Sequence, residues 1–328
     1  MKNLTPFLGN YFNLICGKFE TTVLKDLVNY YPINSLKKRI IYFYLQTLFF
    51  TRLYKIFPTF QNNQIKSKLR KIDILAKQYF VFSQDVTLRK RLYAIGIDYE
   101  NKAFFTKVIW GAEKEFAIKE LEVEKYFGRA LLEKSHLPKQ VFRSDENIVL
   151  LYDLLPKTSK ILNQRPLSLY SDFLENNLDR GLLHQVSIKD FNEFDWWLSF
   201  HSTRHKNFQD YFMQVVSDED KFYVMFAHGD LGSDNLIDVD GELRIIDWEK
   251  SHTHAPKITD YLGIQLGNHH HSIIRDKNLK KSPGSLCKFY SQFIDSELFS
   301  FPEFLLGLSF YLGTNFNLAE FLITDFEV

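Results

Sequence analysis

The chain has 328 residues, of which 45% are hydrophobic and 16% aromatic, with 14 glycines and 9 prolines. This composition supports a large buried core and excludes a disordered chain or a repetitive fibre. The formal net charge is only +1, and the two cysteines, Cys16 and Cys287, do not have the spacing of a metal site. We therefore expect ordinary thiols in a reducing compartment.

Residues 1–75 are expected to form a basic, aromatic-rich helical extension. They contain 12 Lys/Arg against 3 Asp/Glu, a charge of +9, whereas the rest of the chain has 29 against 37, a charge of −8. We expect no secretory signal at the start, and the apolar run at 40–50 is shorter than the about 20 residues that cross a bilayer. A helix packed on the main body is expected, with an anionic membrane surface or an anionic acceptor as the alternative partner.

Residues 76–155 are predicted to form a small unit of strands with one inserted helix. The segment 76–110 alternates and is rich in aromatic and β-branched residues, which is typical of successive strands. The segment 113–137 has apolar residues at helical spacing and ends before Pro138. Residues 147–156 are then predicted to form a buried strand that ends at a proline.

Residues 156–328 are predicted to be mainly helical, and they contain one clear hairpin signal. Asp240-Gly241 is a favoured two-residue turn, and it lies between LIDV and ELRII, which alternate or are apolar. We therefore predict two short antiparallel strands in which Val239 pairs with Glu242.

This register determines which polar side chains meet at the open end of the hairpin. Asp234 falls opposite Asp247, so Asn235 and Asp247 are expected to be neighbours, and the segment with His228 and Asp230 leads directly into that end. Carboxylate and amide oxygens are hard ligands that suit Mg²⁺. A carboxylate five residues before an amide ligand is the spacing of the kinase catalytic loop. The pattern therefore predicts a site for phosphoryl transfer.

The stretch HGDLGSDNLI, followed by RIIDWE, resembles the aminoglycoside phosphotransferase and choline kinase family, whose members are relatives of the protein kinases. The resemblance implies that Asp230 is the catalytic base and that Asn235 and Asp247 hold Mg²⁺. It also implies structural roles for His228, which would brace the loop, and for Asp260, in TDYLG, which would cap or anchor a helix.

The resemblance also assigns nucleotide-binding roles upstream. Lys107, late in a strand, is implied to bind phosphate, and a glutamate of the next helix should hold it. Glu120, Glu122 and Glu124 all compete for this role, and we choose Glu124 because it lies fourteen residues before Pro138. The hinge whose backbone would meet an adenine ring comprises three residues, Tyr152, Asp153 and Leu154.

Residues 83–91 depart from the wider kinase pattern, because SQDVTLRKR contains no glycine. Glycines are often used there, since they let backbone N–H groups approach phosphates. Arg89, Lys90 and Arg91 are interpreted as the solvated face of a strand, with neutralisation of phosphate charge as the alternative.

Together these patterns predict a two-lobed, protein-kinase-like α+β fold, with an antiparallel-sheet lobe at 76–155 and a mainly helical lobe at 156–328. The resemblance, over roughly 76–265, implies transfer of the γ-phosphate of ATP, with Mg²⁺, to a hydroxyl of a small molecule or carbohydrate. The charge contrast between residues 1–75 and the rest of the chain leads to the hypothesis that the acceptor is a sugar of a surface glycan or glycolipid. The alternatives are a non-catalytic kinase-fold binding module, or pseudokinase, and a metal-dependent hydrolase, which would leave Lys107 unexplained. We expect a cytoplasmic protein, or one at the inner face of a membrane, that does not bind nucleic acid.

Overall fold

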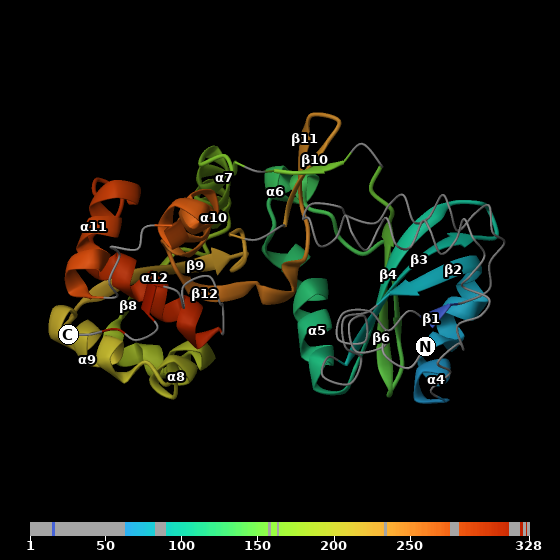
Figure 1. Cartoon of the computed structure of the whole chain (residues 1–328), viewed down its shortest axis with the longest axis horizontal. Coiled ribbons are helices and arrows are strands. Elements are labelled where there is room, and N and C mark those ends of the chain that lie inside the picture. The colour runs from blue at the N-terminus through green and yellow to red at the C-terminus, as the bar shows by residue number, and fades with distance from the viewer. Residues whose placement is uncertain are drawn as a thin grey trace. The chain divides into compact units, whose positions relative to one another are not determined.

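The computed structural model of the chain describes residues 15–16, 63–82, 90–156, 159–162, 164–232, 235–275, 282–314, 322–323 and 326. The chain divides into two compact units (Figure 1). The sheet unit comprises Met1–Leu121, His136–Lys160 and Val239–Gly241, and the helical unit comprises Glu122–Ser135, Ile161–Asp238 and Glu242–Val328. Most of the predicted extension at 1–75 lies outside the described residues. Within the described ranges, none of the helices combines the length and the apolar character needed to span a bilayer.

The sheet unit contains a six-stranded antiparallel sheet with the order β1-β2-β3-β4-β6-β5. Its strands are β1 (Ile15–Cys16), β2 (Ala76–Phe82), β3 (Arg91–Asp98), β4 (Ala103–Trp110), β5 (Gln140–Arg143) and β6 (Asn147–Asp153). Between β3 and β4 the chain turns tightly, because the Asp98 carboxylate accepts the backbone N–H of Glu100 and of Lys102 at 2.9 and 2.8 Å. The strands predicted from alternation are therefore confirmed.

Alternate side chains of the sheet enter two separate cores. On one face, helix α4 (Asn63–Leu75) packs through Ile72 against Leu92, Ala94 and Val108. On the other face, helix α5 (Lys114–Glu122) packs through Ala117 against a cluster that comprises Ile109, Ile148, Leu150 and Tyr152. We call this second face the α5 face. Lys107 lies on it, because side chains two residues apart in a strand share a face.

The single helix predicted over 113–137 is wrong, because the segment forms three pieces. After α5 come a 3-10 turn, Val123–Tyr126, and helix α6 (Arg129–Lys134). At the break, the amide of Asn176 in α7 (Ser168–Asp179) accepts the N–H of Gly128 at 2.5 Å and donates to the Tyr126 carbonyl at 3.1 Å. A distant side chain therefore supplies hydrogen bonds that a continuous helix would make internally.

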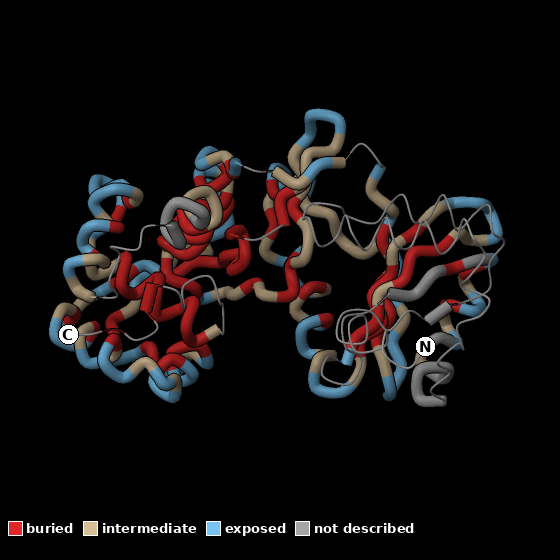
Figure 2. Tube along the Cα trace, in the orientation of Figure 1, coloured by how far each residue is buried: buried red, intermediate tan, exposed pale blue. Residues whose placement is uncertain are grey.

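The helical unit surrounds a long buried helix. Ten successive residues of α12 (Phe301–Gly313), from Phe304 onward, are buried (Figure 2). The helix begins with a capping box between Ser300 and Glu303. The other helices are α8 (Asp195–His201), α9 (Lys206–Val215), α10 (Thr259–Arg275) and α11 (Pro283–Phe293).

Two further sheets have three strands each. One has the order β11-β10-β7, from Glu242–Ile245, Leu236–Val239 and Lys160–Ile161. The other has the order β12-β9-β8, from His252–Pro256, Lys221–Ala227 and His184–Ser187. The expected α+β organisation is confirmed in its parts, since an antiparallel-sheet unit is followed by a mainly helical unit and the predicted hairpin β10–β11 is present.

Candidate active site

The loop between β9 and β10 is attached at its start to helix α10. The backbone N–H groups of His228 and Gly229 donate to the two carboxylate oxygens of Asp260 at 2.8 and 2.9 Å. Asp260 lies in the first turn of α10 and has no exposed surface. Burial raises its pKa to about 7, and the two backbone hydrogen bonds oppose that rise. Asp260 therefore fixes the position from which the loop departs.

His228 connects the same loop to the end of β11. Its Nδ1 accepts the backbone N–H of Asp230 at 3.2 Å, so the ring proton is on Nε2, which lies 3.0 Å from the Ile246 carbonyl. The ring is fully buried, and its centroid is 4.6 Å from that of Trp248. The imidazole is thus enclosed by protein, which agrees with a bracing role.

Asp230 is nearly buried and is held from two sides. Lys250 donates from Nζ to its Oδ2 at 2.9 Å, and the Asn235 amide donates to its backbone carbonyl at 3.1 Å. The preceding residue, Gly229, has a φ of 78°, and a Cβ there would lie 2.5 Å from the Lys250 carbonyl oxygen. The loop and the Lys250 segment are therefore in backbone contact as well as ion-paired.

Sequence reasoning missed Lys250. It lies three residues after Asp247 in a 3-10 turn, Trp248–Lys250, and nothing in the motif singles it out. Asp247 has a left-handed backbone, with φ 63° and ψ 60°, and the 3-10 turn that begins after it ends at Lys250, next to Asp230.

The predicted hairpin places Asn235 and Asp247 at its open end. Asp240 and Gly241, with φ of 54° and 91°, form the turn, as a type I′ turn requires. The N–H of Ile246 donates to the Asn235 carbonyl at 3.0 Å, so Asn235 lies opposite the residue that precedes Asp247. Asp234, which the same register sets opposite Asp247, lies outside the described residues.

The oxygen-bearing side chains at this end suit a hard cation. The amide nitrogen of Asn235 donates to the Asp230 carbonyl, so the amide oxygen is the side-chain atom that could face an ion. The Asp247 carboxylate offers further oxygen atoms, and both residue types are ligands that Mg²⁺ accepts. The residues present therefore fit a magnesium ion.

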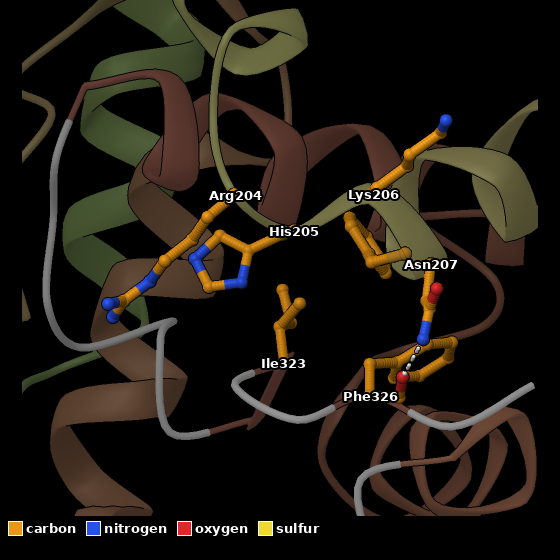
Figure 3. Close-up of a pocket in the computed structure, with 7 residues that line it drawn as sticks. Arg204, His205, Lys206, Asn207, Ile323 and Phe326 are labelled. Atoms are coloured by element: carbon orange, nitrogen blue, oxygen red, sulfur yellow. Dashed lines mark hydrogen bonds between the residues drawn. The ribbon is translucent and has the colours of Figure 1, made fainter.

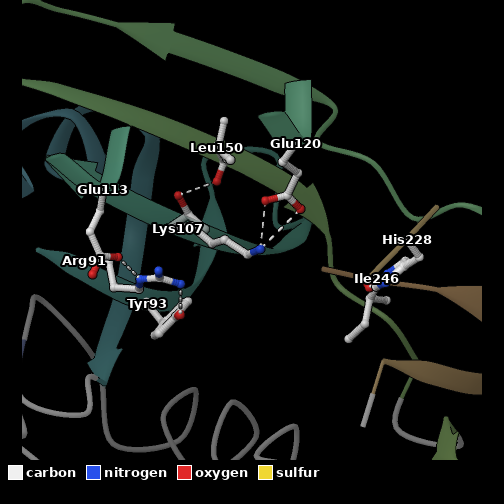
Figure 4. A network of polar contacts seen from close by, with 9 residues as sticks. Arg91, Tyr93, Lys107, Glu113, Glu120, Leu150, His228 and Ile246 are labelled. Atoms are coloured by element: carbon white, nitrogen blue, oxygen red, sulfur yellow. Dashed lines mark hydrogen bonds and ion pairs between the residues drawn. The ribbon is translucent and has the colours of Figure 1, made fainter. Parts of the chain in front are cut away.

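In the sheet unit, the partner of Lys107 is Glu120 rather than Glu124. The ammonium of Lys107 lies 2.9 and 3.2 Å from the two carboxylate oxygens of Glu120 (Figure 4). Only 7% of the Lys107 side chain and none of the Glu120 side chain is exposed. Glu120 lies one turn after Ala117, so it faces the sheet. The helix ends at Glu122, and Glu124 lies exposed in the 3-10 turn beyond it, so our choice of Glu124 is corrected.

The three predicted hinge residues have different environments. Tyr152 is buried on the α5 face, and the Lys107 ammonium lies 5.5 Å from the centre of its ring. Asp153 is exposed and forms an ion pair with Lys139 at 3.0 Å, and Leu154 is half-buried just after β6 ends. The side chain of Asp153 is therefore paired with a surface lysine. A contact between the hinge and an adenine ring would have to come from the hinge backbone.

A cavity of about 300 Å³ lies elsewhere in the helical unit. It is lined by Arg204, His205, Lys206, Asn207, Phe208, Ile323 and Phe326. The guanidinium of Arg204 and the ammonium of Lys206 point to opposite sides of it (Figure 3), and Asn207 donates to the Phe326 carbonyl at 2.9 Å. The cations do not converge, and none of the predicted site residues lines this cavity.

Comparison with known proteins yields a structural likeness only. No family model matches the chain, and no curated protein matches it. Among solved structures, it is similar to the amicoumacin kinase hAmiN in complex with AMP-PNP, Ca²⁺ and Ami, with a TM-score of 0.44 and 13% sequence identity. The likeness covers 77% of this chain and 87% of that chain.

Proposed function

We propose that this protein is a phosphotransferase that moves the γ-phosphate of ATP to an acceptor hydroxyl. The observation that carries the proposal is the arrangement of Asp230, Asn235 and Asp247 around one end of the β10–β11 hairpin. Phosphoryl transfer depends on a positioned base and on oxygen ligands for a divalent ion, and in this proposal Asp230 would be the base and Asn235 and Asp247 the ligands.

Asp230 would act as the general base. It would accept the proton of the acceptor hydroxyl as that oxygen bonds to the γ-phosphorus and the bond to the β-phosphate oxygen breaks, which releases ADP. Its backbone is fixed by the Asn235 amide and its carboxylate by Lys250, so its orientation is set before substrates bind. In the sheet unit, Lys107, held by Glu120, would bind the phosphates of the nucleotide.

Asn235 and Asp247 would hold Mg²⁺, and Asp247 brings a full negative charge to that position. When bound, the ion would neutralise charge on the phosphate oxygens. The hinge at Tyr152, Asp153 and Leu154 would meet the base through its backbone.

The acceptor is proposed to be a small molecule or a carbohydrate. The charge of +9 on residues 1–75 favours a glycan or glycolipid sugar at an anionic membrane surface, at its inner face. Sedimentation with anionic vesicles tests this part of the proposal. A variant with Lys37, Lys38 and Arg39 changed to Gln should bind such vesicles more weakly than wild type. Equal binding would exclude the surface role.

One experiment tests the phosphotransferase proposal itself. Mg-ATP binding and phosphate transfer to a set of hydroxyl acceptors are measured for wild type, Asp230→Asn and Asp240→Asn. Asp240→Asn is the matched control, because it makes the same change at the exposed hairpin turn, where Asn is equally suited to a positive φ. We expect all three to bind Mg-ATP and only Asp230→Asn to lose turnover. Absence of Mg-ATP binding in wild type would refute the proposal.

A non-catalytic nucleotide-binding module is the second candidate. It is favoured by the absence of glycine from residues 83–91 and by the ion pair that engages the Asp230 carboxylate. In the same experiment, this candidate predicts Mg-ATP binding by wild type without turnover on any acceptor.

A further inference from the structure

A second buried cation lies on the α5 face of the sheet, on the same side as Lys107. In the β3–β4 register, Tyr93 is opposite Lys107, and Arg91, two residues earlier in β3, therefore shares its face. The Arg91 guanidinium donates through Nε to the carboxylate of Glu113, and its Nη1 is 3.4 Å from the Tyr93 hydroxyl (Figure 4). Only 9% of the Arg91 side chain is exposed.

The two carboxylates that hold these cations come from one continuous segment. Glu113 ends a 3-10 turn, Gly111–Glu113, that leads directly into α5, and Glu120 lies seven residues later. Seven residues are about two helical turns, so both carboxylates face the sheet. Arg91–Glu113 and Lys107–Glu120 thus form two cation–carboxylate pairs side by side along one helix edge.

Stability alone gives little reason for the Arg91–Glu113 pair. Desolvation offsets most of the attraction in a buried ion pair, and apolar side chains of similar volume are often as stable. The solvated strand face expected for this segment describes Lys90, which is exposed, but is wrong for Arg91, which is buried. The ring of Phe116 lies 5.7 Å from the Arg91 guanidinium carbon and helps to fix its position.

The sequence position of Arg91 indicates what the pair could bind. Arg91 follows directly after residues 83–90, which contain no glycine to bring backbone N–H groups close to phosphates. A guanidinium presents several N–H donors in a rigid plane and binds phosphate oxygens in pairs, so one arginine can supply phosphate donors where the sequence has no glycine to bring backbone N–H groups close.

We propose that Arg91 is a phosphate-binding residue for the nucleotide, positioned by Glu113 as Lys107 is positioned by Glu120. The proposal rests on the proposed function, because it assigns Arg91 to the same nucleotide. It predicts that Arg91 raises the affinity for nucleoside triphosphates and does not change the affinity for the nucleoside alone.

The test is isothermal titration of the full chain with Mg-ATP and, separately, with adenosine. Arg91→Met should weaken Mg-ATP binding about ten- to a hundredfold, the effect of one charge-assisted hydrogen bond pair, and leave adenosine binding unchanged. Glu113→Gln keeps the guanidinium but removes the charge that positions it, so it should weaken Mg-ATP binding less than Arg91→Met does. Lys68→Met is the matched control. Lys68 lies in α4, which packs on the other face of the sheet, and it pairs with Glu146. This variant should change neither the Mg-ATP affinity nor the adenosine affinity.

Arg91→Met leaves the Glu113 charge behind, so the double variant Arg91→Met/Glu113→Gln, which removes both charges, is measured as well. It should show the same selective loss of Mg-ATP affinity. The proposal is overturned if the double variant binds Mg-ATP like wild type, or if Mg-ATP and adenosine affinities fall equally, which is the result of a purely structural pair. A wild-type protein that binds no Mg-ATP would instead remove the proposed function itself.

Discussion

The buried ion pair between Lys107 and Glu120 allows the sheet unit to be perturbed at one defined point. Glu120→Gln removes a carboxylate with no exposed surface and leaves the Lys107 ammonium, whose side chain is 7% exposed. Breaking one partner of a buried pair costs about 3–5 kcal/mol. Because Gln keeps one carbonyl acceptor within reach of the ammonium, we expect the free energy of unfolding to fall by about 3 kcal/mol, at the lower end of that range. Urea denaturation followed by circular dichroism measures the loss.

Two further variants make this prediction specific. Glu124→Gln changes an exposed carboxylate and should alter the free energy of unfolding by less than about 0.5 kcal/mol. The double variant Lys107→Met/Glu120→Gln removes both charges, so it should recover most of the lost stability. Equal losses in Glu120→Gln and Glu124→Gln, or no loss in either, would refute the assignment of Glu120 as the partner of Lys107.

Three predictions concern the loop in the helical unit. Gly229→Ala places a methyl group 2.5 Å from the Lys250 carbonyl oxygen. Gly181→Ala is the control, because that site has φ 64° and open space, and it should lower the free energy of unfolding by about 1–2 kcal/mol. In urea denaturation Gly229→Ala should lower it more, and equal losses would contradict the close contact. Lys250→Met removes the cation 2.9 Å from Asp230, and because about a third of the lysine side chain is exposed we expect a loss of only about 1 kcal/mol, with Lys250→Arg close to wild type by calorimetry. The raised pKa of Asp260, about 7, means that the folded state binds this proton more tightly than the unfolded state, so its contribution to stability is present below pH 4 and is lost as the pH rises toward 7. Asp260→Asn should flatten the pH dependence in that window by up to about 1.4 kcal/mol per pH unit, and an unchanged slope would show that Asp260 titrates normally.

The part of the site that could be predicted from the sequence is the part that depends on local geometry. A two-residue turn at Asp240-Gly241 leaves one register for the strands beside it, and that register brings Asn235 next to the end of β11. No distant contact is needed to infer this pairing. The strands of the sheet unit were predictable for the same reason, because alternation is a property of each segment alone.

The features that were missed depend on contacts between segments far apart in the chain. Glu120, Glu122 and Glu124 are equivalent by residue type, and only the packing of Ala117 on the sheet selects Glu120. The break in the predicted helix over 113–137 depends on the Asn176 side chain, 48 residues beyond Gly128. Such hydrogen bonds leave no periodic signal, so sequence patterns cannot rank the candidates.

The same contacts explain how a polar loop can lie between buried segments. Within the described residues, the backbone N–H groups of His228 and Gly229 are bonded to Asp260, and the His228 ring is bonded to the Ile246 carbonyl. A buried polar group without a partner would cost about 1–3 kcal/mol, so these bonds make the burial possible and also hold the loop in one conformation. In the proposed role of general base, Asp230 would need little reorganisation when substrates bind, which is what efficient proton transfer requires.

Asp247 shows how closely backbone and chemistry are linked at this site. Its left-handed conformation, φ 63° and ψ 60°, precedes the 3-10 turn that ends at Lys250, next to Asp230, while its carboxylate would face the metal. Replacement by Ala would remove the charge and strain the turn together, so a loss of activity would have two causes. Asn tolerates the same conformation without the charge. Asp247→Asn should therefore preserve stability in denaturation and lose only divalent-ion-dependent nucleotide binding, and a large loss of stability would show that the carboxylate itself supports the turn.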